Sequence, residues 1–109
     1  MRAHNAKFGI GQIVRHRFHS FRGVIFDVDF EYGSSHDKWL AIAPEERPRK
    51  DQPFYHLLAE NDEGTYIAYV SEQNLLSDDS GEPVHHPEME FIFAGFDQGH
   101  YRPRPRPMH

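Results

Sequence analysis

The sequence contains no cysteine, and this absence removes several classes of protein at once. Without thiols the chain can hold no disulfide, no zinc–thiolate or iron–sulfur site, and no cysteine nucleophile. Long apolar runs are also missing: no stretch approaches the roughly 18 residues of a membrane span, and residues 1–7 contain no hydrophobic signal core. We therefore expect a cytoplasmic protein without membrane contact.

The motifs that usually accompany catalysis are missing as well. There is no glycine-rich phosphate loop, no nucleophile elbow and no recognisable serine–histidine–aspartate arrangement. Nine histidines include one adjacent pair, His85 and His86, but neither the helical spacing nor the finger pattern of zinc sites occurs. His56 lies in an apolar segment and is better explained as a buried, hydrogen-bonded imidazole. We predict a non-enzymatic protein with no catalytic residues, no metal and no cofactor.

What the sequence does contain is sufficient for one packed domain. Its 109 residues suit a single core, and aromatic residues make up 14% of them. Within a net charge of −5, residues 1–26 carry five basic and no acidic groups, whereas residues 27–101 carry all seventeen acidic groups. An acidic average argues against a general nucleic-acid binder, but the basic ends could still meet a local anionic partner.

Two strands are expected early in the chain, over residues 10–17 and 22–32. In the second, apolar side chains at positions 24, 26, 28 and 30 alternate with a row of carboxylates, so one face belongs to the core. The row comprises Asp27, Asp29 and Glu31. Such a row either pairs with the arginines of the first strands or discourages edge-to-edge association. Acid–base chemistry and cation binding are the alternatives.

The middle of the chain predicts a short helix and then a hairpin. Ser35 is expected to cap the helix, which carries Trp39 on its apolar side. Residues 54–60 and 65–70 predict a hairpin with Glu60 opposite Thr65. Because both hairpin faces are then largely apolar, we expect cover on both sides, by a curled barrel, the Trp39 helix or another subunit of a homo-oligomer.

The last third is less regular. Residues 71–76 predict one helical turn capped by Ser71, and residues 88–96 suit a short helix or an edge strand equally well. The alternating arginines and prolines from Arg102 predict an extended, mobile tail. The whole pattern indicates a mainly β fold, a small, strongly bent β barrel of SH3-like type with one or two short helices. We expect a flexible stretch over 1–6, a single domain over 7–101 and a disordered tail over 102–109.

Two features are candidates for binding DNA or a protein partner. Arg15, Arg17 and Arg22 surround Phe18 in a basic–aromatic hairpin, which suits phosphates and unstacked bases. An ordinary solvated surface is the alternative for this hairpin. Trp39 is a candidate docking residue for a protein partner, and cover of the core is its alternative.

Several blocks of residues together resemble one known family. The similarity covers roughly residues 7–76, with looser agreement to about Tyr101, and rests on the order and spacing of the blocks. The chain resembles the heat-shock protein HspQ family, also described as the YccV-like, hemimethylated-DNA-binding domain. The matching blocks are Lys7-Phe8-Gly9-Ile10-Gly11-Gln12, Val14-Arg15-His16, Arg22-Gly23-Val24-Ile25, Asp27-Val28-Asp29 with Tyr32, Pro53-Phe54-Tyr55-His56, and Tyr69-Val70-Ser71-Glu72-Gln73-Asn74-Leu75.

The resemblance implies a small β barrel in the bacterial cytoplasm and two activities. One is that of a specificity-enhancing factor for the Lon protease, which promotes degradation of particular or denatured proteins during heat stress. The other is binding of hemimethylated DNA. Family members often have a proline where this chain has Phe30, and the arginine–proline tail is peculiar to this sequence.

Physical arguments rank these two activities. The chain is acidic overall and predicts no recognition helix for a major groove, which weakens a sequence-reading role on DNA. Apolar surface on the central hairpin suits protein contacts better. The leading hypothesis is therefore a protease adaptor that binds Lon and its protein substrates, with hemimethylated DNA second. An interaction module with neither activity is a third possibility.

Overall fold

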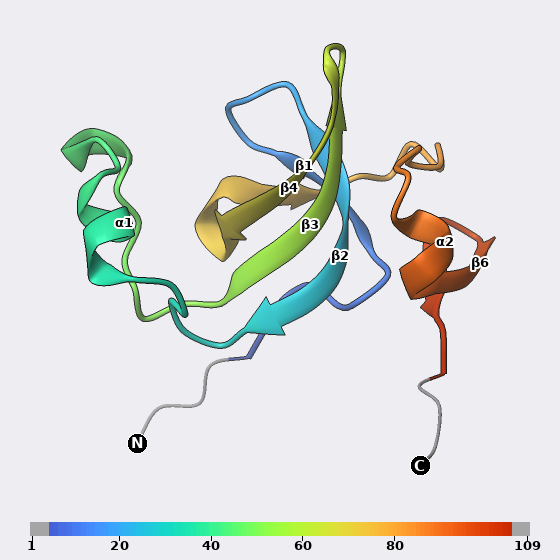
Figure 1. Ribbon diagram of the computed structural model, residues 1–109, viewed down its shortest axis with the longest axis horizontal. Helices are drawn as coiled ribbons and strands as arrows, with labels where there is room; N and C mark the ends of the chain where they lie inside the picture. The colour runs from blue at the N-terminus through green and yellow to red at the C-terminus, as the bar shows by residue number, and fades with distance from the viewer. Residues whose placement is uncertain (1–4, 106–109) are drawn as a thin grey trace.

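The computed structural model describes residues 5–105, which form a mainly β fold with two short helices, as the sequence predicted (Figure 1). None of the described helices is long and apolar enough to cross a membrane. Five strands form one antiparallel sheet in the order β4-β3-β2-β1-β5, and two more form a separate hairpin. The strands are β1 (Ile13–His16), β2 (Arg22–Asp29), β3 (Phe54–Asn61), β4 (Gly64–Ser71), β5 (Leu75–Ser77), β6 (Phe93–Asp97) and β7 (His100–Pro103).

Short helical pieces connect these strands. They are α1 (His36–Leu40), α2 (Met89–Ile92) and two 3-10 turns, η1 (Pro44–Glu46) and η2 (Glu72–Asn74). The predicted helix start is confirmed, because Ser35 Oγ accepts a hydrogen bond of 3.1 Å from the Lys38 amide. The five-stranded sheet is bent, and its edge strands β4 and β5 are joined by η2 without pairing in the described part of the chain.

Both faces of the sheet are packed, and β3 supplies side chains to both. Leu57 and Leu58, neighbours in sequence, are each 0% exposed and belong to two different core clusters. The cover expected on both sides of the hairpin is thus confirmed for β3. One cover is the C-terminal α2–β6–β7 unit, whereas α1 lies apart from the sheet and contributes no buried residue (Figure 1). The clusters are Val14, Ile25, Tyr55, Leu57, Ala59, Val70 and Leu75, and Ile13, Val24, Leu58, Val84, Phe93 and Tyr101.

The predicted register of the β3–β4 hairpin is confirmed. Glu60 pairs with Thr65, Leu58 with Ile67, and so on to the end of both strands. The turn is tighter than expected, because Asn61 and the final glycine of the predicted turn already belong to the strands. β4 is an edge strand, and its Ile67 is 54% exposed. The prediction that both faces of the hairpin are covered is therefore wrong for the outer part of β4.

The first two strands are shorter than expected. Gly11 has a φ of 91°, a left-handed conformation that ends regular strand geometry before β1. In β2 the register shifts between Ile25 and Asp27, so the predicted alternation from residue 24 to residue 30 is interrupted. As a consequence Ile25 is fully buried, whereas Phe30, expected to face the core, is 58% exposed.

The C-terminal part corrects three expectations and settles one alternative that the sequence left open. Ser71 precedes a 3-10 turn, but its Oγ makes no capping bond and has no partner among the described residues. Residues 75 and 76, expected in that turn, instead pair with β1 as part of β5. Segment 88–96, which suited a helix or a strand equally well, contains both: helix α2 comes first and strand β6 follows. The expected mobile tail is partly structured, because β7 continues to Pro103; residues 106–109 lie outside the described part.

Candidate functional site

A cleft of about 1040 Å³ opens between the β3–β4 hairpin and the segment that links β2 to β3. We call this segment, residues 30–53, the excursion; it carries α1 and η1 and projects from one side of the sheet (Figure 1). Much of the cleft wall is apolar or aromatic. The contributing side chains include Phe21, Tyr32, Ile42, Phe54, Tyr66, Ala68, Tyr69 and Val70.

The excursion keeps its shape through contacts within itself. The Trp39 indole donates a 2.8 Å hydrogen bond to the Pro48 carbonyl. The Arg47 guanidinium lies 4.9 Å from the Trp39 ring and donates to the carbonyl of Ile42 at 2.9 Å. Trp39, which the sequence suggested as a docking residue, is half-buried and anchors this local structure. Trp39 does not line the cleft, whereas Ile42 is one of several excursion residues that do.

At the inner end of the cleft, three strands bring Asp29, His56 and Tyr69 together. Asp29 Oδ2 accepts a 2.7 Å hydrogen bond from the Tyr69 hydroxyl and lies 3.1 Å from His56 Nε2. The Tyr69 oxygen in turn accepts from the Gly33 amide at 2.9 Å. A Cβ on Gly33 would stand 2.6 Å from Asp29 Oδ2, so the missing side chain permits this approach.

These contacts set the ionisation of the inner end. The hydrogen bond from Tyr69 holds the pKa of Asp29 below its ordinary value, with help from His56 and against the effect of burial. Burial and the bond to Asp29 raise the pKa of Tyr69, which stays protonated. We expected the carboxylate row either to pair with Arg15, Arg17 or Arg22 or to discourage edge-to-edge association, and the pairing can be checked for Asp29. That pairing was wrong for Asp29, because the bulge in β2 turns it toward β3 and β4 instead.

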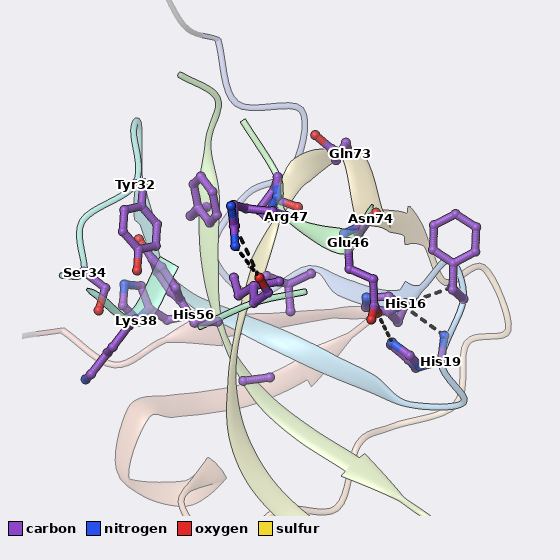
Figure 2. A pocket seen from close by; sticks show the side chains of 18 of the residues that line it. His16, His19, Tyr32, Ser34, Lys38, Glu46, Arg47, His56, Gln73 and Asn74 are labelled. Atoms are coloured by element: carbon purple, nitrogen blue, oxygen red, sulfur yellow. Dashed lines mark hydrogen bonds and ion pairs between the residues drawn. The ribbon is translucent and has the colours of Figure 1, made fainter. Parts of the chain in front are cut away.

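The opposite end of the cleft is formed by the turn between β1 and β2. His16 Nδ1 accepts hydrogen bonds of 3.0 Å from the amides of Phe18 and His19, so this nitrogen carries no proton. Burial, reinforced by His19, lowers the pKa of His16. His19 Nε2 lies 3.9 Å from Glu46 Oε1, and this contact spans the cleft from the turn to η1 (Figure 2).

The three predicted arginines do not form one basic patch. Arg22 is largely buried, with Nε donating to Asp78 at 2.9 Å and Nη1 to Glu60 at 3.2 Å. It also donates to the carbonyls of residues 82 and 83. Hydrogen bonds from Ser80 and the ion pair with Arg22 hold the pKa of Asp78 below its ordinary value, although burial alone would raise it. Arg22 therefore closes a structural network.

Arg15 and Arg17 remain at the surface. Arg15 is paired with Arg22 across the strands and is exposed, and Arg17 Nε donates to the Gln73 carbonyl at 3.0 Å. Phe18, at the tip of the turn, is 73% exposed. The basic–aromatic hairpin of the sequence is thus reduced to two arginines beside one exposed ring.

The histidine pair contacts strand β4 and its partner rather than a common centre. The His85 amide donates to Glu60 at 2.8 Å, and His86 Nε2 lies 3.2 Å from the Tyr66 carbonyl. Among residues 5–105, no group of three or more histidine, aspartate or glutamate side chains is arranged to hold a metal ion. His56, expected to be buried and hydrogen-bonded, is hydrogen-bonded but only half-buried.

The cleft itself was not foreseen from the sequence. One signal was available: the predicted register already placed His56 opposite Tyr69. Their joint contact with Asp29 depends on the bulge, and the far wall depends on how the excursion folds back. Neither feature has a local sequence signature.

A protein-family model described as "Hemimethylated DNA-binding protein YccV like" matches residues 6–100. The match therefore takes in both core clusters except Tyr101, every lining residue of the cleft, and all strands except β7, of which it includes the first residue alone. It extends well beyond the blocks from which the resemblance was first inferred.

Proposed function

The chain belongs to the YccV-like family, and from this membership we propose that it is a non-enzymatic, cytoplasmic adaptor for the Lon protease. In this role it binds exposed segments of particular or denatured proteins and promotes their degradation. The family's description also names hemimethylated DNA, which is the second candidate below.

One observation carries the adaptor proposal: an open cleft with largely apolar walls lies beside an edge strand. Folded proteins bury their aromatic and aliphatic side chains, so a cleft of this kind selects chains that have lost their packing. The edge strand β4 offers backbone groups to an extended segment, while pockets beside it receive alternate side chains. An acidic molecule with net charge −5 suits this role better than broad attraction to nucleic acid.

The test is the rate at which purified Lon degrades an unfolded model substrate, with and without this protein at low micromolar concentration. We expect acceleration for some substrates but not for others. The variant Ile42→Asn, which makes the cleft wall polar, should lose this acceleration. Leu40→Asn is the matched control, because Leu40 lies on the same excursion, is 46% exposed and does not line the cleft.

Two outcomes would contradict the adaptor proposal. Unchanged Lon turnover across several substrates, together with no association in a pull-down, would remove the adaptor role. Equal loss of acceleration in the Ile42 and Leu40 variants would remove the cleft from it. Melting temperatures of both variants are needed to exclude unfolding as the cause.

A second candidate function, binding of hemimethylated DNA, is favoured by the turn between β1 and β2. Exposed Arg15 and Arg17 could contact phosphates while Phe18 stacks on an unpaired base. A band-shift assay comparing hemimethylated with unmethylated duplex at fixed salt tests it. Binding that is unchanged by Arg15→Ala and Arg17→Ala would exclude this turn as the DNA site.

A further inference from the structure

We infer that the inner end of the cleft recognises a basic side chain, arginine or lysine, of the polypeptide segment that the cleft binds. This inference rests on the proposed function, because it names what one subsite of the same cleft selects. It follows from the Asp29 carboxylate, the aromatic rings around it, and the placement of the protein's own cations.

Among residues 5–105, Asp29 presents a negative charge without a permanent positive partner. It contacts the Tyr69 hydroxyl and His56, and no lysine or arginine within residues 5–105 forms an ion pair with it. Its side chain is 33% exposed, so a ligand can reach it. The hydrogen bond from Tyr69, helped by His56, keeps the pKa of this carboxyl low, and it is therefore charged at neutral pH. A cation from outside would complete the pair.

The carboxylate sits among aromatic rings. The Phe54 and Tyr69 rings are stacked with centroids 5.3 Å apart, and the His56 ring lies 4.6 Å from that of Tyr69. The faces of such rings attract cations, and the attraction adds to that of a neighbouring carboxylate. Within this protein the same preference is visible nearby, where the Lys50 ammonium lies 5.6 Å from the Tyr32 ring.

The described lysines and arginines nearest to this carboxylate do not pair with it. The Lys50 ammonium forms a hydrogen bond with His36 Nδ1 within the excursion. The Arg47 guanidinium is committed to carbonyls of the excursion at 2.9 Å, and Lys38 lines the cleft with its ammonium extended away from His56 (Figure 2). Asp29 also repels phosphate, so this end of the cleft disfavours nucleic acid.

Apolar wall lies next to this charge. The Tyr32 ring lines the cleft beside Phe54 and Tyr69, with ring centroids 5.2 and 6.0 Å away. Arginine and lysine each combine an apolar stem with a charged head, and both parts would find a partner here. The preferred segment is thus a hydrophobic stretch interrupted by one basic residue.

The test uses a fluorescein-labelled seven-residue peptide, Ala-Leu-Phe-Arg-Phe-Leu-Ala, and the same peptide with citrulline, the uncharged isostere, at its centre. Fluorescence anisotropy should give about fivefold to tenfold tighter binding of the arginine peptide, as expected for one partly desolvated cation contact. In Asp29→Asn this preference should vanish. The asparagine oxygen can still accept from Tyr69, so the fold should be kept. Asp27→Asn is the matched control, since Asp27 lies on the same strand but does not line the cleft, and it should keep the preference.

We expect Asp29→Asn to bind both peptides with equal affinity. A purely structural role of Asp29 would leave the ratio of the two affinities unchanged. If both peptides bind equally to the wild type and Ile42→Asn weakens both, the cleft binds segments but the basic-residue inference fails. If neither peptide binds, the inference fails as well, and the degradation assay above then decides separately whether the adaptor role survives.

Discussion

At the scale of single residues, Tyr69 is the side chain that joins the cleft to the sheet. Its hydroxyl donates to Asp29 and accepts from the Gly33 amide. Tyr69→Phe removes both bonds but keeps the ring, and we expect a loss of about 1–2 kcal/mol in the free energy of unfolding, measured by urea denaturation at pH 7. The control is Tyr66→Phe on the same strand; Tyr66 is 36% exposed, and this substitution should change stability by less than about 0.5 kcal/mol.

The stability difference between wild type and Tyr69→Phe should also depend on pH. The pKa of Asp29 is lower in the folded state than in the unfolded chain. Ionised Asp29 therefore contributes fully to the free energy of unfolding at a pH above the pKa of the unfolded chain. This contribution is lost as the pH falls through the lower pKa of the folded state. Without the Tyr69 hydroxyl this pKa moves back up. The stability difference between wild type and Tyr69→Phe should therefore shrink below about pH 4. A difference that stays constant from pH 7 to pH 3 would show that Tyr69 does not act through Asp29.

Arg22 and Arg15 face each other across two strands but have opposite roles. Arg22→Ala leaves Asp78, whose side chain is 9% exposed, without its ion pair. We expect a loss of about 2–4 kcal/mol in thermal or chemical unfolding, because an uncompensated buried charge remains. Arg15→Ala, at an exposed position, should stay within about 0.5 kcal/mol of the wild type. Similar stabilities of the two variants would contradict the structural role given to Arg22.

Residue types alone could not separate these two arginines. Both lie in a segment whose pattern predicts a basic hairpin, and the difference comes from residues 60, 78, 82 and 83, which converge on Arg22 from far along the chain. The predicted pairing of Asp29 with the arginines was wrong for a related reason. One bulge at Phe26 changes which face Asp29 occupies, and a bulge has no reliable signature in a single strand.

At the scale of elements, the C-terminal hairpin is attached to the sheet through Gly11. The Gly11 amide donates to Ile25, and the Gly11 carbonyl accepts from Tyr101, both at 2.8 Å. A Cβ here would collide with the Tyr101 carbonyl, and the φ of 91° is strained for any other residue. Gly11→Ala should therefore destabilise the protein by about 2–4 kcal/mol and separate β7 from the sheet. Calorimetry gives the first effect and faster amide exchange at Tyr101 the second.

Gly9→Ala is the control for this element. A Cβ added to Gly9 would meet no atom within 4 Å, and Gly9 has no left-handed φ, so the substitution should be nearly neutral. Equal destabilisation by both substitutions would show that the N-terminal segment, rather than the contact with β7, is sensitive.

The helices and strands that could be predicted are those whose sequence signals lie close together in the chain. The β3–β4 register follows from a tight turn between two apolar strands, and the start of α1 follows from its serine cap. β5 was not predictable, because three residues acquire strand geometry only by pairing with β1, some sixty positions earlier. The strand in the arginine–proline segment is similar: β7 exists because β6 lies beside it.

At the scale of the whole molecule, the two core clusters do not define two independent units. Val24 and Ile25 on β2, like Leu57 and Leu58 on β3, are sequence neighbours that point into different clusters. Loss of either strand would open both clusters. The C-terminal unit and the sheet should therefore unfold together, unless the contact through Gly11 is broken first.

The distribution of charge over the whole molecule makes the DNA alternative quantitative. The net charge is −5, and Arg22 is neutralised by two carboxylates, so the exposed arginines left on the β1–β2 hairpin are Arg15 and Arg17. Each phosphate contact contributes about −0.9 to the slope of log affinity against log salt. If this turn binds duplex DNA, the slope should be about −2, and Arg15→Ala or Arg17→Ala should each reduce it by about one contact. Band shifts from about 50 to 200 mM salt measure this slope. A much steeper slope would require basic groups elsewhere, such as those of the C-terminal segment, and binding without salt dependence would mean that phosphates are not contacted.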